Sequence, residues 1–213
     1  MSLLQLRDVS KSYGRKRVLD AVTVGFPIGL TLVTGPSGAG KSTLLRIIAT
    51  AEKPSGGRVE WDGLPLPRAR PALRGALGYA PQAVDLPEDL TARGFALHMA
   101  ALKGLEPGAA DRQFAAITEA IGLHADINNR IATFSGGMRR RLIFAQALLG
   151  SPRLLALDEP TAELDAETAR RLSALILERA QTAAVVMTTH LADELAPHAA
   201  AVLRVGDGGV ATA

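Results

Sequence analysis

A glycine-rich run at residues 35–42 has the composition and spacing needed to hold phosphate. It matches the pattern G-x-x-x-x-G-K-[ST] at every fixed position. Glycines there let backbone N–H groups turn inward around phosphate oxygens, and the start of the following helix adds positive potential. The lysine should reach the β and γ phosphates, the serine hydroxyl should bind Mg²⁺, and the next threonine should touch the α phosphate. The residues assigned to the nucleotide phosphates are Gly35, Pro36, Ser37, Gly38, Ala39, Gly40, Lys41, Ser42 and Thr43.

Two adjacent acids, Asp158 and Glu159, follow the apolar run at residues 154–157. A buried acid at the end of an apolar strand is costly unless it faces a cation, so Asp158 is predicted to hold Mg²⁺ through water. Glu159 is then placed to polarise the attacking water. A helix N-cap would explain either acid alone, but it does not explain the apolar strand in front of both. The pair therefore predicts hydrolysis of a nucleoside triphosphate.

A third motif, Ser135-Gly136-Gly137, precedes a predicted helix at residues 136–150. The free N–H groups and the dipole of a helix start favour an anion, and the two glycines admit a close approach. Ser135 as a simple N-cap is the plainer interpretation, and it is compatible with anion binding. The motif predicts a second phosphate contact.

Composition limits the classes of protein that fit. The chain has 213 residues, 47% of them hydrophobic, enough for one domain or one domain with an inserted lobe. It has no cysteine, which excludes disulfides and thiolate chemistry. No apolar run approaches the roughly 20 residues of a membrane span, and the start does not resemble a signal peptide, so we expect a cytoplasmic location. The net charge of +3 and 4% aromatic content do not favour nucleic acid. The basic clusters at residues 15–17, 68–74 and 139–141 are expected to be solvated faces.

The elements that must position these motifs alternate along the chain. Alternating residues predict β structure in the first third, ending in a strand at 29–34 that feeds the phosphate loop and a helix at 41–50. Short strands are expected at 59–61 and 77–80, separated by a proline-rich turn, and helices between 91 and 150. A buried parallel strand at 154–158, a helix at 166–180 and strands at 183–188 and 202–205 complete the chain. The pattern predicts an α/β core interrupted by a helical lobe.

The ordered set of motifs resembles the nucleotide-binding subunit of an ATP-binding cassette (ABC) transporter over nearly the whole chain. The resemblance implies a P-loop NTPase core, a mainly parallel sheet flanked by helices, with an N-terminal antiparallel β portion and an inserted helical subdomain. It implies one domain, 1–213, with the catalytic core at 1–85 and 151–213 and the helical subdomain at 86–150. No room is expected for a regulatory domain after the last strand.

The resemblance also assigns roles to single residues. Tyr13 matches the aromatic ring that stacks on adenine, and Gln82 matches a glutamine that contacts Mg²⁺ and water and couples to the membrane partner. His190, in Thr189-His190, matches a switch histidine that contacts the γ-phosphate and holds the water of Glu159. Taken alone, each would be read as an ordinary surface side chain. His98, His124 and His198 match no motif and are interpreted as surface or packing residues.

The resemblance implies a dimer with a membrane partner. In this family the motif that Ser135-Gly136-Gly137 matches is called the signature. Its serine and glycines contact the γ-phosphate of ATP on the opposite subunit, so two sites close over two ATP molecules. We therefore expect ATP and Mg²⁺ as ligands, a homodimer or a dimer with a paralogous ATPase, and a transmembrane permease. The subunit would lie on the inner face of the cell membrane and touch it only through the permease. No nucleic acid partner is expected.

Several residues depart from the common family pattern. Phe134 and Met138 replace the usual leucine and glutamine of the signature, and Glu163 replaces a small residue near the dimer seam. Met138 lacks the polar atoms that glutamine would offer to the nucleotide. The run at residues 134–141 resembles the signatures of drug, antibiotic and polysaccharide exporter ATPases, as does the segment at 102–105. These features favour an exporter and leave its cargo open.

Two other functions compete with this interpretation. A soluble cassette ATPase acting on ribosomes or DNA would usually carry paired cassettes or long coiled-coil insertions, and the sequence has neither. A P-loop kinase of a small metabolite would share the phosphate loop, but it would not need the Ser135-Gly136-Gly137 motif ahead of Asp158 and Glu159.

Overall fold

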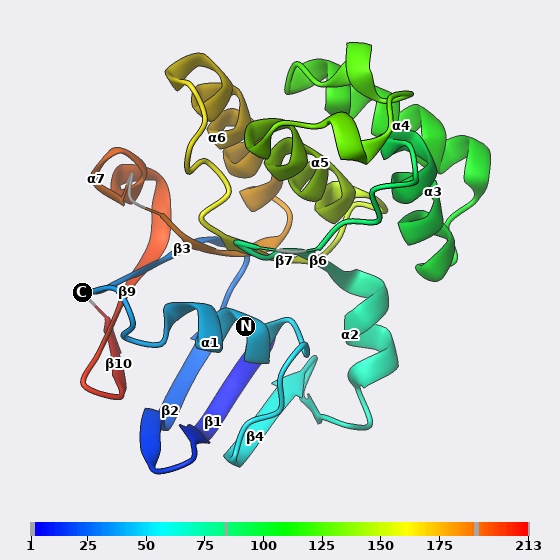
Figure 1. Cartoon of the computed structure of the whole chain (residues 1–213). Coiled ribbons are helices and arrows are strands. Elements are labelled where there is room, and N and C mark those ends of the chain that lie inside the picture. The colour runs from blue at the N-terminus through cyan, green and yellow to red at the C-terminus, as the bar shows by residue number, and fades with distance from the viewer. Residues whose placement is uncertain (1–2, 84, 190–191, 213) are drawn as a thin grey trace.

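The first of two β-sheets comes from the N-terminal third of the chain. The structure is a computed structural model that describes residues 3–83, 85–189 and 192–212 (Figure 1). This sheet is antiparallel, in the order β2-β1-β4-β5. Its strands are β1 Leu4–Tyr13, β2 Lys16–Phe26, β4 Gly56–Trp61 and β5 Leu64–Pro65. In β1 the buried Leu4 and Leu6 alternate with more exposed residues, so one face of the sheet packs inward. The predicted antiparallel β portion is confirmed.

The second sheet carries the strands on which the motifs depend. Its order is β10-β9-β3-β8-β7-β6, and every pair is parallel except β9 with β10. The strands are β3 Gly29–Thr34, β6 Leu77–Ala80, β7 Leu154–Asp158, β8 Ala184–Thr188, β9 Ala199–Gly206 and β10 Gly209–Thr212. All residues of β7 and β8 are buried, as expected for central strands covered on both faces. The predicted mainly parallel core is confirmed.

Helices cover both faces of the parallel sheet (Figure 1). Helix α1 (Lys41–Ile48) lies between the two sheets, and its Leu44 and Ile47 share a buried cluster with Trp61 and Val186. Helices α5 (Gly136–Leu148) and α6 (Ala166–Ala180) cover the other face. The short helix α7 (Ala192–Leu195) precedes β9. The central strands β7 and β8 are therefore buried on both faces.

The predicted helical segment contains three helices, α3 (Ala92–Leu102), α4 (Pro107–Ala120) and α5. Two 3₁₀ turns, His124–Asp126 and Ile131–Thr133, connect α4 to α5. Buried side chains of these helices, Phe114 and Phe144 among them, belong to the same cluster as Leu155 of the sheet. The helices thus pack directly on the core, and the boundaries of the helical subdomain stay a prediction.

The short strand β5, the helices α2 and α7 and the strand β10 were not expected from the sequence. Helix α2 (Arg70–Ala76) lies between the turn predicted at Pro65 and Pro67 and strand β6, and it buries only Leu73, too little to give a periodic pattern. Strand β10 is also short, with no buried residue, and it forms by pairing with β9. In the described part of the chain, no helix combines the length and apolarity needed to cross a membrane.

Candidate functional site

The phosphate loop leaves β3 in the middle of the parallel sheet and ends at the start of α1. Gly35 has φ of +132°, and a Cβ there would lie 2.1 Å from the carbonyl oxygen of Val205. Gly40, the N-cap of α1, has φ of +109°, and a Cβ there would lie 2.8 Å from Cγ1 of Val18. Only glycine fits at these two positions. The loop is therefore shaped by the backbone around it.

Lys41 bends back over this loop. Its Nζ donates hydrogen bonds to the carbonyl oxygens of Gly35 (2.8 Å) and Pro36 (3.0 Å). The ammonium group is thus held above the turn that the motif assigns to phosphate. An anion with several oxygens can replace these two carbonyls as its partner.

One cavity of about 650 Å³ brings most of the predicted residues together. Its volume is in the range of small-molecule sites. The predicted residues that line it are Tyr13, Gly35, Ser37, Gly38, Gly40, Lys41, Ser42, Thr43, Gln82, Asp158 and Glu159. Pro36 contributes its carbonyl to Lys41, and Ala39 packs against the cluster below the loop. The base, phosphate and acid positions therefore share one space.

The two acids stand at the carboxyl ends of neighbouring strands. Asp158 ends β7 directly opposite Thr188, the last residue of β8, and both are buried. Thr188 Oγ1 donates to Asp158 Oδ1 (2.6 Å) and accepts from the backbone N–H of Glu159 (2.9 Å). A single hydroxyl thus orients the carboxylate of one acid and the backbone of the other. Sequence reasoning missed Thr188; the only signal was a hydroxyl residue ending a buried strand beside the predicted Thr189-His190.

The backbone of Glu159 turns sharply out of the strand. Its φ is +53°, a left-handed conformation that is uncommon outside glycine. The carbonyl oxygen of Glu159 accepts a hydrogen bond from Nη1 of Arg140 (3.2 Å), and Nη2 of Arg140 lies 3.7 Å from Glu163. Helix α5 therefore contacts the acid loop directly, through an arginine that the sequence analysis did not assign to the site.

Gln82 follows β6, an edge strand of the parallel sheet, and lines the cavity together with Tyr13. Before it in the chain, the backbone carbonyl of Tyr79 accepts a hydrogen bond from Gln146 of α5 (2.8 Å). Burial, together with the charge of Asp158, raises the pKa of the Tyr79 hydroxyl. The phenol accordingly stays neutral near the acids.

The oxygen donors suit Mg²⁺. Ser42, Gln82 and Asp158 line the same cavity and offer a hydroxyl, an amide oxygen and a carboxylate. Among the described residues, no group of three or more His, Cys, Asp or Glu side chains could hold a metal ion. Mg²⁺ typically takes one or two carboxylates and completes its shell with water and substrate phosphates. The residues present fit a metal that enters together with a nucleotide.

Ser135, Gly136 and Gly137 lie elsewhere. Ser135 is the N-cap of α5 and accepts from the N–H of Met138 (3.3 Å). The three residues are absent from the lining of the 650 Å³ cavity, as far as the described residues go. Ser135 and Gly136 are exposed, whereas Phe134 is buried in the cluster under the helices. Phe134 anchors the motif, and the helix start faces outward.

The histidine predictions divide into two groups. His190 lies outside the described residues; its neighbour Thr189 lines the cavity. His98, His124 and His198 are all exposed, which confirms their interpretation as surface residues.

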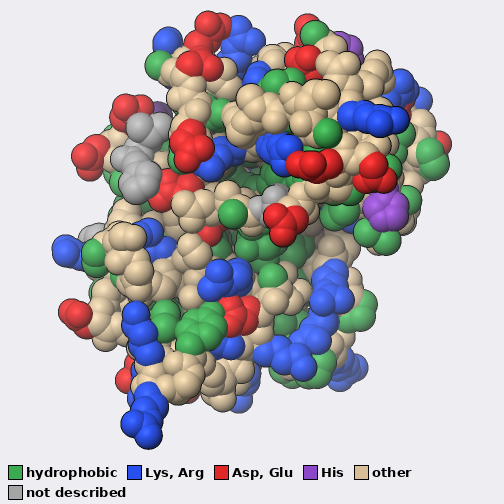
Figure 2. Space-filling model, viewed as in Figure 1, with side chains coloured by type: hydrophobic (Ala, Val, Ile, Leu, Met, Phe, Trp, Pro, Cys, Tyr) green, Lys and Arg blue, Asp and Glu red, His purple; other side chains and the backbone are tan. Residues whose placement is uncertain are grey.

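The expectation of a solvated face was wrong for the arginines at residues 139–141. Arg139 pairs with Glu88, Arg140 reaches Glu159, and Arg141 donates to the carbonyl of Gly122. All three are partly buried, because α5 packs against the acid loop and the turns after α4. Figure 2 shows Lys and Arg side chains interspersed with Asp and Glu over the face seen there.

Known proteins are similar to this chain in sequence. Residues 23–162 match the family model described as "ABC transporter". The Nod factor export ATP-binding protein I of Rhizobium etli is 34% identical over 199 residues, which cover 91% of this chain and 62% of that protein. The linearmycin resistance ATP-binding protein LnrL of Bacillus subtilis is 29% identical over 195 residues, which cover 91% and 63%. The chain thus spans less than two thirds of these relatives.

Solved structures agree with the sequence relatives. The ATP-binding subunit of an ABC transporter superposes with a TM-score of 0.88 at 26% identity, covering 100% of this chain and 90% of that one. A dimeric bacterial ABC transporter cassette gives a TM-score of 0.87 at 25% identity, with 97% and 96% covered. A post-hydrolysis state of the same cassette, bound to ADP and Pi, gives 0.86 at 25% identity, with the same coverage.

Proposed function

The chain belongs to the ABC transporter family as an ATP-binding cassette, and we propose that it binds and hydrolyses ATP as a dimer to drive a separate membrane permease. One observation carries this proposal. The phosphate loop, the buried Asp158 and the neighbouring Glu159 line one cavity of about 650 Å³. A nucleotide bound there would have its phosphates next to both acids.

The phosphate loop would supply binding and orientation. Backbone N–H groups of residues 37–40 and the start of α1 would face the phosphates, and Thr43 would touch the α phosphate. Lys41 would exchange the carbonyls of Gly35 and Pro36 for the β and γ phosphates. Mg²⁺, when bound, would neutralise charge developing on the phosphate oxygens, and Ser42, Asp158 and Gln82 would hold it.

Glu159 would orient and polarise the attacking water. Its backbone is fixed by Thr188, which holds its N–H, and by Arg140, which holds its carbonyl. Its carboxylate is therefore carried on a backbone restrained on both sides. We propose that Gln82 and His190 complete the water and γ-phosphate contacts, as the family resemblance implies.

Ser135, Gly136 and Gly137 would act on a neighbour's nucleotide. They sit at an exposed helix start outside the cavity of their own chain, among the described residues. A second copy of the cassette, or a paralogous ATPase, would bring its phosphate loop to this helix start. Each site would then be incomplete without the partner.

We propose a permease as the further partner, and export as the direction. The relatives bear the names of an export ATP-binding protein and a resistance ATP-binding protein. The cassette would lie on the inner, cytoplasmic face of the cell membrane and contact it through that permease. Recovery of a multi-helix membrane protein with the cassette from detergent extracts would support this assignment, whereas recovery with ribosomes or DNA would contradict it.

Turnover of a Glu159→Gln variant tests the hydrolysis. Release of phosphate from ATP should fall at least about 100-fold, because a general base contributes at that scale. ATP should still bind and should hold the variant as a dimer in size-exclusion chromatography. Glu167→Gln is the matched control, since Glu167 is exposed on α6 and pairs with Arg171.

Full turnover by the Glu159 variant would exclude the role assigned to this acid. Transfer of phosphate to a small metabolite, with no release of free phosphate, would indicate a kinase.

A further inference from the structure

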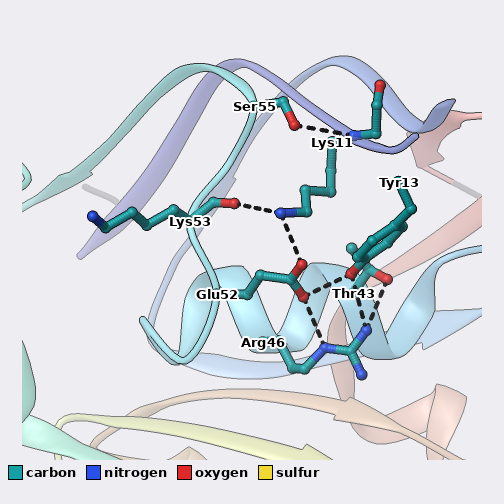
Figure 3. Close-up of polar contacts among 8 residues, drawn as sticks. Lys11, Tyr13, Thr43, Arg46, Glu52, Lys53 and Ser55 are labelled. Atoms are coloured by element: carbon teal, nitrogen blue, oxygen red, sulfur yellow. Dashed lines mark hydrogen bonds and ion pairs between the residues drawn. The ribbon is translucent and has the colours of Figure 1, made fainter. Parts of the chain in front are cut away.

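A cluster of four side chains lies beside the phosphate loop and belongs to none of its motifs (Figure 3). Resting on the function proposed above, we propose that Glu52 and Arg46 are positioning residues that fix Tyr13 as a one-sided platform for the nucleotide base. Lys11 covers one face of this platform. The base is held against the other face.

The cluster is assembled from three separate segments. Lys11 and Tyr13 are two residues apart at the end of β1 and therefore share a face of the strand. Arg46 lies in the last turn of α1, and Glu52 follows that helix. The residues converge because α1 packs against the antiparallel sheet (Figures 1 and 3).

The phenol of Tyr13 has a partner on each side. Its hydroxyl donates to Glu52 Oε2 (2.7 Å) and accepts from Arg46 Nη2 (3.2 Å). Tyr13 as a residue is 44% exposed and lines the cavity. An exposed aromatic ring with its edge fixed by two hydrogen bonds presents a face without losing rotamer freedom on binding.

Glu52 holds the cluster together. Its Oε1 pairs with Lys11 Nζ (2.8 Å), and its Oε2 also accepts from Arg46 Nε (3.0 Å). Although burial acts to raise it, hydrogen bonds from Lys11, Tyr13 and Arg46 keep the pKa of Glu52 below its ordinary value. Glu52 is thus a charged anchor for three partners.

Lys11 makes the platform one-sided. Its Nζ lies 5.1 Å from the centroid of the Tyr13 ring and is tied down by Glu52 and by the carbonyl of Lys53 (2.9 Å). An ammonium group over an aromatic face is a favourable contact, and it occupies that face. A base can then stack only on the other one. Stacking uses the π-face that every base has, so this platform would accept guanine as well as adenine.

Arg46 links the platform to the phosphate loop. The same Nη2 that contacts Tyr13 also donates to Thr43 Oγ1 (3.2 Å), one turn earlier on α1. Thr43 lines the cavity directly after Ser42. The spacing between the base platform and the phosphate contacts is therefore set by one guanidinium group.

Nucleotide binding by Glu52→Gln tests the proposal, with calorimetry as the readout. The variant should bind ATP and GTP about 5-fold more weakly, in line with the loss of one stacking contact. Its affinity for inorganic tripolyphosphate should stay within about twofold, because the phosphate loop is untouched. Glu60→Gln is the matched control: Glu60 lies on β4, pairs with Arg7 and Arg58, and is absent from the cavity lining among the described residues.

A double-variant cycle distinguishes a role of Glu52 in positioning Tyr13 from a role in stability alone. Tyr13→Ala should weaken ATP binding at least as much as Glu52→Gln, and Glu52→Gln should add nothing further on the Tyr13→Ala background. Additive losses, equal losses for ATP and tripolyphosphate, or the same loss in Glu60→Gln would overturn the proposal. A wild-type chain that binds neither ATP nor tripolyphosphate would instead refute the proposed function.

Discussion

The phosphate half of the site and the signature half are built in opposite ways. The phosphate half, residues 35–43 with Asp158 and Glu159, sits at the ends of buried parallel strands and is held by hydrogen bonds within the chain. The signature half, residues 134–138, is an exposed helix start anchored by the buried Phe134. One half is complete in its own chain, and the other offers its groups outward. Under the proposed function, a site divided in this way would need a second molecule.

The largest effect should come from separating the two halves. Ser135→Arg fills the exposed helix start, and we expect at least about a 100-fold loss of ATP turnover, the scale of losing an electrostatic contact to the transition state. Lys41→Ala should be equally inactive, because it removes the ammonium group of the phosphate half and leaves the signature half intact. Mixing the two variants should restore turnover to about one quarter of wild type, since half of the random dimers would hold one intact site.

The matched control for this mixture is a variant that removes the N-cap of a different helix. Thr91 caps α3 as Ser135 caps α5, so Thr91→Arg mixed with Lys41→Ala should give about the turnover of wild type and Lys41→Ala mixed together. If the Ser135 and Lys41 variants show no recovery at any ratio, the signature does not act across a dimer.

A smaller effect should follow from loosening the phosphate half internally. Thr188→Val removes the hydroxyl shared by Asp158 and Glu159, and we expect kcat to fall about 10-fold through misplacement of the acids. Thr31→Val is the control, because the Thr31 hydroxyl on β3 is buried without a hydrogen-bond partner in the described structure. The kcat of Thr31→Val, measured by steady-state turnover, should equal that of wild type. An equal loss of kcat in Thr31→Val and Thr188→Val would assign the effect to packing.

The contact between the halves should matter less. Arg140→Gln removes the hydrogen bond to the Glu159 carbonyl, and we expect kcat to fall about 3-fold while the KM for ATP is unchanged. Arg153→Gln loses an ion pair with Asp62, outside the cavity lining among the described residues, and should keep wild-type turnover. A change in KM alone would show that Arg140 affects nucleotide binding and not the acid.

Substitution of Lys103, in the helical lobe, is expected to leave turnover unchanged and to alter only the pH dependence of stability. Lys103 donates to the Leu149 carbonyl (3.0 Å), and burial lowers its pKa to about 8. Between that value and the ordinary pKa of 10.5, the unfolded chain binds more protons than the folded one, so stability should rise with pH. The gain is at most roughly 3 kcal/mol. Chemical denaturation from pH 7.5 to 10 should show this slope in wild type and in the exposed control Lys53→Met, and Lys103→Met should flatten it.

Motifs predicted well which residues come together, because each places fixed residue types next to one another in the sequence. The phosphate loop and the acid pair are of this kind, and the structure brings them into one cavity. Thr188 could not be found this way, since its role exists only when β7 and β8 align Asp158 with it. The Tyr13 cluster joins three segments, so the sequence showed the ring but not its supports.

Errors arose where packing overrode composition. The arginines at residues 139–141 looked like a solvated face, but the helix that carries them lies against the acid loop and the turn at Gly122. Helix α2 buries a single leucine and gave no periodic signal. For the arginines, the deciding partners lie at least 19 residues away along the chain.

The contact between Gly35 and Val205 has a consequence for the smallest unit that can bind nucleotide. The backbone carbonyl of Val205, on β9, would lie 2.1 Å from any Cβ at position 35. The floor of the phosphate loop is thus supplied by a strand beyond residue 162, where the family match ends. A fragment trimmed to residues 23–162 would keep the phosphate loop, the acid pair and Ser135-Gly136-Gly137, but it would lose the backbone against which the loop packs.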